Sequence, residues 1–329
     1  MKVIIPLAGK GTRLRPHTYA TAKPLLRVAG RPVMSYILDD LKALGVEEIV
    51  FITGYLKETI EQYIRASYPD FHAHFVEQPV QDGTAGAVRL AEPYIDSECL
   101  IIFVDTLFDA DLSLVKRLPE AVSGVIWAKY VEDFQRFGVL VRDDDGFMKR
   151  IVEKPRDPIS KLANIGLYYI RDWKLLFEGI HATMHGPRDR SGEFYLTDAF
   201  QYMVDRGARI QIEEVEGWYD CGQLETLLET NRHLLEQGRA LRPQGGRGLR
   251  VKDPVRIEEG VRLENVELGP NVTVEAGCDI RDSSLSDCII GANTRIHGAR
   301  LHHSLIGDHV TLEGVTGAVS LANYSEVRS

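Results

Sequence analysis

A glycine-containing loop near the start of the chain has the residue types that point most directly to chemistry. The loop reads LAGKGTRLRP over residues 7–16 and follows the apolar run 3–5, which predicts a short buried strand. Gly9 and Gly11 allow the backbone to turn tightly and to approach a ligand closely. Backbone N–H groups exposed in such a loop form a concavity that suits phosphate oxygens.

Two basic side chains add positive charge beside this loop. Arg13 lies within it, and Lys23 follows in the segment TAKPLL at residues 21–26. Together with the glycines they predict a nucleoside triphosphate site. The loop lacks the Gly-Lys-Ser/Thr ending of an ATPase phosphate loop and the GxGxxG spacing of a dinucleotide site. An ordinary strand-to-helix turn with two solvated basic residues is the structural alternative.

Composition narrows the class of protein. The 329 residues, of which 44% are hydrophobic, suffice for one large domain and a smaller one. A net charge of −9 argues against nucleic acid or an anionic membrane surface as a partner. We expect neither a signal peptide nor a membrane span. The cysteines lack CxxC spacing and predict buried free thiols in a reducing cytoplasm; they are Cys99, Cys221, Cys278 and Cys288.

The first 110 residues alternate strand and helix patterns. Strands are expected at 3–7, 49–53, 72–76 and 100–104, and amphipathic helices at 32–44, 57–66 and 85–92. This alternation predicts an α/β fold with a mostly parallel sheet and helices on both faces. Ligands of such sheets bind beyond the C-terminal strand ends, where the Gly9 loop and Asp105 both fall.

The middle of the chain predicts more strands and then more helices. Residues 123–170 have strand patterns, with a hairpin turned at 143–146, and helical patterns return at 173–182, 196–206 and 224–236. The stretch 239–250 is rich in Gly and Arg without apolar periodicity, which predicts a linker.

From Val251 onward the chain contains an internal repeat. LGPNVTV, IGANTRI and IGDHVTL, which begin at Leu268, Ile290 and Ile306, are near-copies of one another. Each strand is too short to bury itself, so successive coils are expected to stack into a parallel β-helix. The segment resembles the left-handed β-helix of the hexapeptide-repeat family. Its histidines are expected to be surface residues of a structural helix; they are His297, His302, His303 and His309.

The loop, taken with other motifs in order, resembles the sugar-1-phosphate nucleotidyltransferases, or NDP-sugar pyrophosphorylases. The further matches are EQP at 77–79, DGTAGA at 82–87, VDT at 104–106, FGVL at 137–140, EKP at 153–155, NIGLYYI at 164–170 and GWYDCG at 217–222. This resemblance covers about residues 1–235. It implies a Rossmann-like nucleotidyltransferase domain at 1–238, followed by the linker at 239–250, the β-helix at 251–316 and a tail at 317–329.

The resemblance also implies the reaction, in which a sugar-1-phosphate attacks the α-phosphate of a nucleoside triphosphate and releases pyrophosphate. The attacking oxygen is already anionic, so the protein needs charge neutralisation and alignment rather than a general base. By resemblance, Asp105 and Asp220 hold the Mg²⁺ that bridges the phosphates. The alternatives are a helix N-cap for Asp105 and a turn-forming role for Asp220.

Matching positions imply roles for the other site residues. Arg13, Lys23 and Lys154 resemble the catalytic cations, with Lys154 on the sugar phosphate. The nucleotide-binding positions are Leu7, Ala8, Gly9, Gly11, Gln78, Gly83 and Asp105, and the sugar-binding positions are Gly138, Glu153 and Asn164. An exposed turn is the alternative for the EKP motif.

Gln78 and Gly83 match base-reading positions. The Gln78 amide offers a donor and an acceptor, which suits thymine or uracil, although a turn-capping glutamine is the alternative. The favoured substrates are therefore dTTP and glucose-1-phosphate, then UTP, and more distantly GTP with mannose-1-phosphate. The loop is one glycine shorter than the usual LAGGxGTR, a form that recurs among glucose-1-phosphate uridylyltransferases and keeps UTP as the alternative, and Val104 replaces the usual glycine before Asp105.

Two expectations concern the whole protein. The β-helix is expected to join subunits into a homo-oligomer, because its flat faces commonly pack between chains. The chain is expected to act in the cytoplasm. A non-catalytic subunit that senses NDP-sugars is the alternative from a different class. Such subunits tend to lose charged site residues, whereas this chain keeps Arg13, Lys23, Asp105, Lys154 and Asp220.

Overall fold

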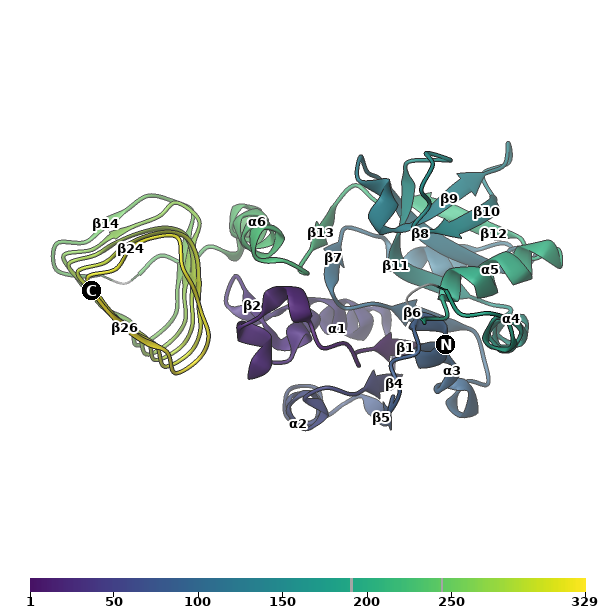
Figure 1. The fold of residues 1–329 in the computed structure, drawn as a ribbon, viewed down its shortest axis with the longest axis horizontal. Coiled ribbons are helices and arrows are strands. Elements are labelled where there is room, and N and C mark those ends of the chain that lie inside the picture. The colour runs from purple at the N-terminus through teal and green to yellow at the C-terminus, as the bar shows by residue number, and fades with distance from the viewer. Residues whose placement is uncertain (190–191, 244) are drawn as a thin grey trace. The chain divides into compact units, whose positions relative to one another are not determined.

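The computed structural model describes residues 1–189, 192–243 and 245–329 (Figure 1). The chain forms two compact units. Unit 1 comprises Met1–Gly9 and Ile37–Trp218, and unit 2 comprises Lys10–Tyr36 and Tyr219–Ser329. The boundary therefore passes through the glycine loop, after Gly9. No helix of the described residues is long and apolar enough to cross a lipid bilayer.

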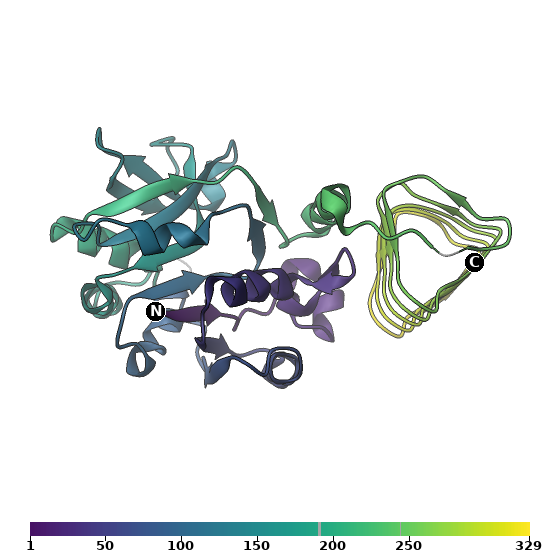
Figure 2. The ribbon, with the colours of Figure 1, turned by 180° about the vertical axis from the view of Figure 1, so that it is seen from behind.

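Unit 1 is built on one mixed sheet, whose strands run in the order β10-β9-β11-β6-β1-β4-β5, with β8 and β12 attached through β11. Strands β1, β4, β5 and β6 are mutually parallel, whereas β11 runs antiparallel to β6, β8 and β9. The bounds are β1 Lys2–Pro6, β4 Glu48–Thr53, β5 His72–Glu77, β6 Cys99–Ile102, β7 Thr106–Phe108, β8 Gly124–Tyr130, β9 Gly138–Arg142, β10 Met148–Glu153, β11 Leu162–Ile170 and β12 Ile210–Glu214. Since β1 lies between β4 and β6, the N-terminus enters the middle of the sheet (Figure 2).

Apolar residues are buried on both faces of this sheet. Val3, Ile4 and Ile5 are consecutive in β1 and all fully buried, so both faces must be covered, because successive side chains point to opposite sides. Ile4 belongs to the core that includes residues of α3, α4 and α5. The helices are α1 Val33–Leu44, α2 Lys57–Ser67, α3 Thr84–Arg89, α4 Trp173–His185 and α5 Leu196–Asp205. The expected α/β architecture is confirmed.

Two elements end earlier than the sequence predicts, and the expected hairpin is present. The strand expected at 100–104 ends at Ile102, although the Phe103 N–H still donates to the Gly166 carbonyl of the neighbouring β11 at 2.9 Å. The helix expected at 85–92 ends at Arg89, and a 3₁₀ turn with Pro93 at its centre follows at Glu92–Tyr94. The expected hairpin is present, with Asp143 Oδ1 accepting from the Phe147 N–H at 2.8 Å.

Unit 2 combines a short N-terminal segment with the C-terminal part of the chain. Residues 10–36 form the 3₁₀ turns Thr12–Leu14, His17–Tyr19 and Lys23–Leu25, the hairpin β2 Arg27–Val28 and β3 Arg31–Pro32, and the start of α1. The C-terminal part begins at the end of β13 Trp218–Asp220, continues through α6 Leu224–Leu234 and a π-helical turn Leu235–Arg239, and enters the coils. Helix α6 packs against β2, β20 and β22.

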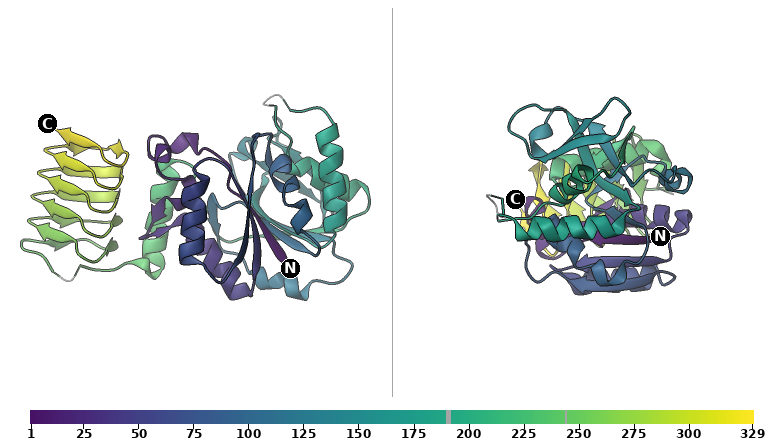
Figure 3. Two further views of the ribbon diagram at one scale, coloured as in Figure 1. Left: turned by 90° about the horizontal axis from the view of Figure 1, so that it is seen from below. Right: turned by 90° about the vertical axis from the view of Figure 1, so that its right-hand side faces the viewer.

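The repeat forms a stack of parallel coils, seen in the left view of Figure 3. Register is continuous along the stack: Leu263 pairs with Ile280, Ile280 with Ile296, and Ile296 with Leu312. These residues lie in the apolar interior of the coils. The strands are β14 Arg250–Val251, β15 Val255–Ile257, β16 Arg262–Glu264, β17 Glu267–Leu268, β18 Val272–Val274, β19 Asp279–Arg281, β20 Ser284–Ile290, β21 Arg295–His297, β22 Arg300–Ile306, β23 Thr311–Glu313, β24 Thr316–Gly317, β25 Ser320–Leu321 and β26 Glu326–Arg328.

Coil structure extends beyond the repeat seen in the sequence. Leu241 and Arg247, within the stretch predicted as a linker, form parallel bridges to Arg256 and Glu264. The tail from Gly317 contributes β25 and β26, which pair with β22 and β23. All four cysteines are buried free thiols, as expected, and burial raises the pKa of the Cys278 thiol to about 12. The four histidines of the repeat are exposed.

Candidate active site

The end of β1 and the start of the glycine loop form one wall of the candidate site in unit 1. The Leu7 N–H donates to the Ile52 carbonyl at 2.7 Å, which continues the sheet past β1. Ala8 is buried, and its carbonyl accepts a hydrogen bond from the Gln81 amide. At Gly9 a Cβ would meet nothing within 4 Å, so this glycine leaves open space at the end of β1.

The turn predicted to read the base lies after β5 and is held by Gln78. This side chain is 8% exposed, and its amide nitrogen donates to Asp82 Oδ1 at 3.0 Å and to the Gly83 carbonyl at 3.4 Å. Gly83 has φ of 103°, and a Cβ there would lie 2.3 Å from the Phe194 carbonyl oxygen, so only glycine fits. The amide nitrogen of Gln78 thus stabilises its own turn, and base recognition by this residue stays a prediction.

The Gln78 turn is joined to the segment before α5. The Phe194 N–H donates to the Asp82 carbonyl at 2.8 Å, and the Phe194 carbonyl accepts from the Ala85 N–H at 3.0 Å. The next residue, Tyr195, receives a hydrogen bond from Lys154 Nζ at 3.3 Å. Two positions predicted separately, Gln78 and Lys154, are therefore connected by a short continuous series of contacts.

The three predicted sugar-binding positions converge at the start of β9. A Cβ on Gly138 would lie 2.3 Å from Asn164 Nδ2 and 2.9 Å from Glu153 Oε2. Asn164 Nδ2 donates to the Gly138 carbonyl at 2.9 Å, and Asn164 Oδ1 accepts from the Tyr168 hydroxyl. Asn164 therefore braces β9 against β11, and the absence of a side chain at Gly138 lets the Asn164 amide and the Glu153 carboxylate pack against the backbone of β9.

Glu153 and Lys154 form the polar end of this cluster. Glu153 Oε2 accepts from Thr197 Oγ1 at 3.3 Å, and Glu153 Oε1 lies 3.8 Å from Lys154 Nζ. Burial raises the pKa of the Glu153 carboxyl, against the opposite effects of Lys154 and Thr197. Burial alone lowers the pKa of Lys154, but its hydrogen bond to Tyr195 and the nearby Glu153 charge outweigh this and raise it.

The position of Lys154 is fixed by its backbone and by Tyr195. Lys154 has φ of 43°, a left-handed conformation, and its N–H donates to the Phe137 carbonyl at 2.9 Å. Its ammonium lies 4.7 Å from the centroid of the Tyr195 ring. Glu153, Lys154 and Tyr195 line an open groove. The EKP motif is thus an ordered, charged wall of a groove.

The predicted metal-binding aspartates lie in different units. Asp105 is exposed in the turn between β6 and β7 of unit 1. Asp220 is half-buried at the end of β13 in unit 2, where Asp220 Oδ1 accepts from the Gly222 N–H at 2.8 Å and Asp220 Oδ2 accepts from Thr226 Oγ1 at 3.4 Å. Within the described residues, no three His, Cys, Asp or Glu side chains gather in an arrangement suited to a metal ion. Mg²⁺ needs only one or two carboxylates besides phosphate oxygens and water, so a carboxylate at either position is a donor of a suitable type.

The predicted triphosphate cations belong to unit 2. Arg13 is exposed in the first 3₁₀ turn, just after Gly11, whose φ is 60°. A Cβ on Gly11 would lie 3.0 Å from both Lys23 Cβ and Thr18 Cγ2, so the loop and Lys23 approach closely because Gly11 has no side chain. Thr18 Oγ1 donates to the Gly11 carbonyl at 2.9 Å.

Sequence reasoning missed several residues that shape the site. Gln81, Thr197 and Tyr195 contact predicted site residues, and Tyr168 holds Asn164. The first three lie outside the motifs used, and their roles depend on contacts across the fold. Tyr168 lies within NIGLYYI, four residues after Asn164. Its contact with Asn164 goes with a shift in the register of β11 between these two residues, which the sequence alone does not show.

A comparison with protein families places the chain. A family model described as Nucleotidyl transferase matches residues 2–237. The chain therefore belongs to the nucleotidyl transferase family of enzymes.

Similar proteins cover between 72% and 94% of the chain. It is 31% identical to a glucose-1-phosphate thymidylyltransferase of Streptomyces antibioticus, over 94% of this chain and 93% of that protein. It is 32% identical to the UTP–glucose-1-phosphate uridylyltransferase AglF of Haloferax volcanii, over 72% of this chain and 98% of that protein. A match to the bifunctional protein GlmU of Methanocaldococcus jannaschii has 35% identity over 79% of this chain, but covers only 61% of GlmU.

A solved structure agrees with these relatives. The structure of a UDP-glucose pyrophosphorylase complexed with UDP-glucose matches with a TM-score of 0.64 and 25% identity. The match covers 72% of this chain and 98% of that chain.

Proposed function

We propose that this enzyme transfers a nucleotidyl group from a nucleoside triphosphate to a sugar-1-phosphate and releases pyrophosphate. The observation that carries the proposal is the pairing of Glu153 and Lys154 on one groove wall, with Gly138 packed directly behind the Glu153 carboxylate. A carboxylate beside an ammonium suits a sugar phosphate, because the carboxylate accepts from sugar hydroxyls while the ammonium binds the phosphate. Relatives named for glucose-1-phosphate support the same substrate class.

The chemistry requires alignment and charge neutralisation. The sugar phosphate oxygen attacks the α-phosphorus of the triphosphate, a new P–O bond forms, and the bond to the pyrophosphate leaving group breaks. The nucleophile is already anionic, so no residue needs to remove a proton. In our proposal Lys154 orients the sugar phosphate, while Arg13 and Lys23 stabilise the negative charge on the triphosphate.

We propose that Asp105 and Asp220 hold a Mg²⁺ ion. Both supply hard carboxylate oxygens, and Asp220 is oriented by Gly222 and by the first turn of α6. When bound, the ion would neutralise charge on the phosphates. An Asp105→Ala variant is expected to lose turnover. If turnover survives, the metal role is wrong.

For the base, we propose dTTP with glucose-1-phosphate, giving dTDP-glucose. Both the thymidylyltransferase relative and the uridylyltransferase relative support a pyrimidine. UTP giving UDP-glucose is the second candidate, and GTP with mannose-1-phosphate is a more distant one. Leu7, Ala8, Gly9 and Gly83 are the backbone positions proposed to contact the nucleotide, and the open space at Gly9 supports this at the end of β1.

The test is pyrophosphate release by the purified protein with Mg²⁺ and glucose-1-phosphate, with dTTP, UTP, GTP, ATP and CTP offered one at a time. Preference for dTTP or UTP is the expected result, and release with GTP alone would refute the pyrimidine assignment. If no combination of triphosphate and sugar phosphate gives pyrophosphate release, the result favours the alternative of a sensing subunit without catalytic activity.

We also propose that the protein is a cytoplasmic homo-oligomer. The buried free thiols support a reducing compartment, and the stacked coils offer flat faces for subunit contacts. Light scattering of the full chain tests the assembly, because a mass equal to that of one chain would refute it.

A further inference from the structure

One face of the β-helix is covered by other parts of unit 2. An outward-facing column runs along the stack, because Arg256 pairs with Thr273, Thr273 with Ile289, Ile289 with Leu305, and Leu305 with Ser320. Thr273, Ile289 and Leu305 are at most 5% exposed although their neighbours in each strand point into the coil interior. Helix α6 packs against β20 and β22, which contain Ile289 and Leu305.

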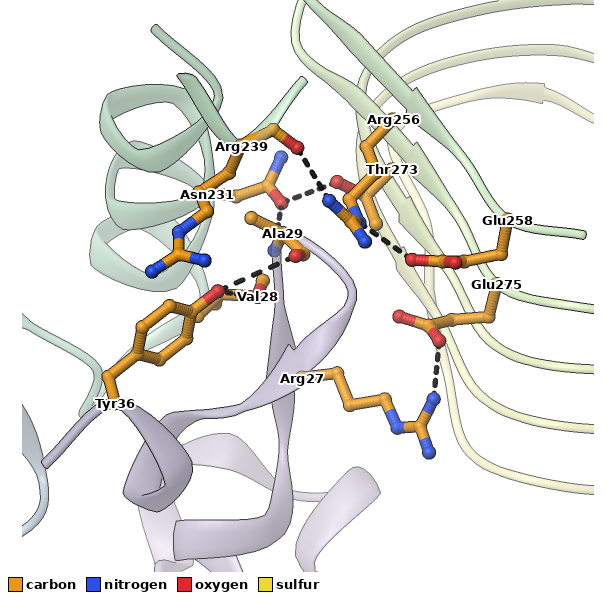
Figure 4. Close-up of polar contacts among 10 residues, drawn as sticks. All are labelled: Arg27, Val28, Ala29, Tyr36, Asn231, Arg239, Arg256, Glu258, Thr273 and Glu275. Carbon is orange, nitrogen blue, oxygen red and sulfur yellow. Dashed lines mark hydrogen bonds and ion pairs between the residues drawn. The ribbon is translucent and has the colours of Figure 1, made fainter. Parts of the chain in front are cut away.

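The N-terminal hairpin of unit 2, β2 and β3, contacts the first coils of the β-helix through a buried polar cluster (Figure 4). Asn231 of α6 is fully buried, and Asn231 Oδ1 accepts from the Ala29 N–H at 2.9 Å and from Thr273 Oγ1 at 2.7 Å. Arg27 forms an ion pair with Glu275, whose side chain is 2% exposed. Hairpin, helix and coil therefore share one set of hydrogen bonds.

Glycine is required where the hairpin approaches the coils. A Cβ on Gly30 would lie 2.3 Å from Arg256 Nε and 2.4 Å from Glu258 Oε1. Arg256 Nε donates to Glu258 Oε1 at 2.6 Å, and Arg256 Nη1 donates to the Arg239 carbonyl at 2.8 Å. The first coils are thus built against the hairpin turn, with no space left for a side chain.

The other end of the N-terminal segment contacts the last coil. His17 is 4% exposed, and His17 Nε2 lies 3.0 Å from Ser320 Oγ, at the end of the same outward column. Burial lowers the pKa of His17 to about 4, so its ring is neutral at physiological pH. Asn323 Nδ2 also donates to Thr21 Oγ1, at 3.5 Å.

These contacts bracket the residues proposed to bind the triphosphate. In the sequence, Lys23 lies between Thr21, which contacts the last coil, and Arg27, which contacts Glu275 in one of the first coils. Thr18 follows His17 directly and donates to the Gly11 carbonyl. The coils of unit 2 therefore hold the segment that carries Arg13 and Lys23 in place through these contacts.

We infer that the β-helix positions the residues 10–26, and that Ser320 in its last coil is a positioning residue for Arg13 and Lys23. The role in turnover rests on the proposed function, whereas the role in holding the segment does not. The coil stack is long enough to contact the segment at two separated points. The tail that has no sequence pattern is therefore part of the scaffold.

The test compares three full-length variants. Ser320→Ala removes the hydroxyl beside His17, and Ser320→Thr restores it. Ser325→Ala is the matched control, because Ser325 Oγ donates at 2.8 Å to the Ala322 carbonyl of its own coil. Two readouts are taken from each variant: amide hydrogen exchange of peptides covering residues 10–26, and kcat and KM for pyrophosphate release.

For Ser320→Ala we expect faster exchange in residues 10–26, by about three- to tenfold, as for the loss of one hydrogen bond. We expect kcat to fall by a similar factor with KM for the sugar phosphate unchanged. Ser320→Thr and Ser325→Ala should match the unaltered protein in both readouts. Unchanged exchange in Ser320→Ala overturns the inference, and so does faster exchange with an unaltered kcat. If the unaltered protein shows no turnover, the proposed function fails, and the exchange data alone decide whether the coil holds the segment.

Discussion

Replacing Gly138 by alanine tests the proposed sugar pocket most sharply. The new Cβ would lie 2.3 Å from Asn164 Nδ2 and 2.9 Å from both Glu153 Oε2 and Thr197 Cγ2, where an ordinary contact is 3.4–4 Å. At least the Asn164 amide must therefore move by about 1 Å. Gly138 has no left-handed φ, so the effect is steric and falls on the side chains of the pocket.

A displacement of about 1 Å in a positioning group can cost up to about 100-fold in rate. We expect kcat/KM for the sugar-1-phosphate to fall by about 10- to 100-fold, which corresponds to about 1.4–2.7 kcal/mol at 1.36 kcal/mol per tenfold. Overpacking should also lower the free energy of unfolding by about 1–3 kcal/mol. The assay is steady-state pyrophosphate release with the sugar phosphate varied, alongside urea denaturation.

Gly124→Ala is the matched control. Its Cβ would lie 2.6 Å from the Tyr169 carbonyl oxygen, so it crowds the same sheet away from the groove. We expect it to lower stability while kcat/KM per folded enzyme is kept. A Gly138→Ala enzyme with kcat/KM within twofold of the unaltered protein would refute the placement of the sugar pocket.

Three further predictions follow from single contacts. Asn231→Ala leaves the Ala29 N–H and the Thr273 hydroxyl without their buried acceptor, so the free energy of unfolding should fall by about 2–4 kcal/mol in urea denaturation; a loss below about 1 kcal/mol contradicts this. Glu153→Gln should stabilise the protein more at pH 7 than at pH 4, when each free energy of unfolding is compared with that of the unaltered protein. Burial raises the folded-state pKa of Glu153, so the stability that this carboxyl contributes is complete below its unfolded pKa and is lost as the pH rises through the folded pKa. A pH-independent difference between the two proteins would refute that assignment. Tyr195→Phe keeps the ring near the Lys154 ammonium but removes the hydroxyl, so kcat/KM should fall about three- to tenfold; unaltered kinetics would show that this hydrogen bond does not position Lys154.

Local pattern predicted the elements of the sheet well. The strand expected at 49–53 is β4, and the helix expected at 57–66 is α2. These segments have strong periodicity of their own, and the register of parallel strands follows from the buried apolar run. Errors in these segments lie at their ends, as at Ile102, whereas β12 Ile210–Glu214, which pairs with β8 in the same sheet, was not predicted.

The partition of the chain was not visible in the sequence. Residues 10–36 group with coils about 200 to 300 residues later, and the contacts that hold them are single polar pairs such as His17 with Ser320. Such pairs leave no periodic signal. The last coil escaped recognition for a related reason. Ile289 pairs with Leu305, but Leu305 pairs with Ser320, so this coil is one residue shorter and the repeat offset breaks there.

The placement of candidate site residues could be predicted where two of them are neighbours in one sequence motif. Glu153 and Lys154 are adjacent in sequence and remain so in the groove. Asn164 was assigned to the sugar wall, yet its amide is bonded to Gly138 and Tyr168, which makes it a brace for that wall. A motif gives the residue type, but the direction of the side chain depends on the bulge in β11.

The most direct test of nucleotidyl transfer follows oxygen atoms. Glucose-1-phosphate labelled with ¹⁸O in its non-bridging phosphate oxygens is incubated with the protein, Mg²⁺ and dTTP, and the products are weighed by mass spectrometry. Attack by the sugar phosphate on the α-phosphorus predicts dTDP-glucose that retains every labelled oxygen, with unlabelled pyrophosphate. Labelled pyrophosphate, or consumption of dTTP without an NDP-sugar, would contradict the account.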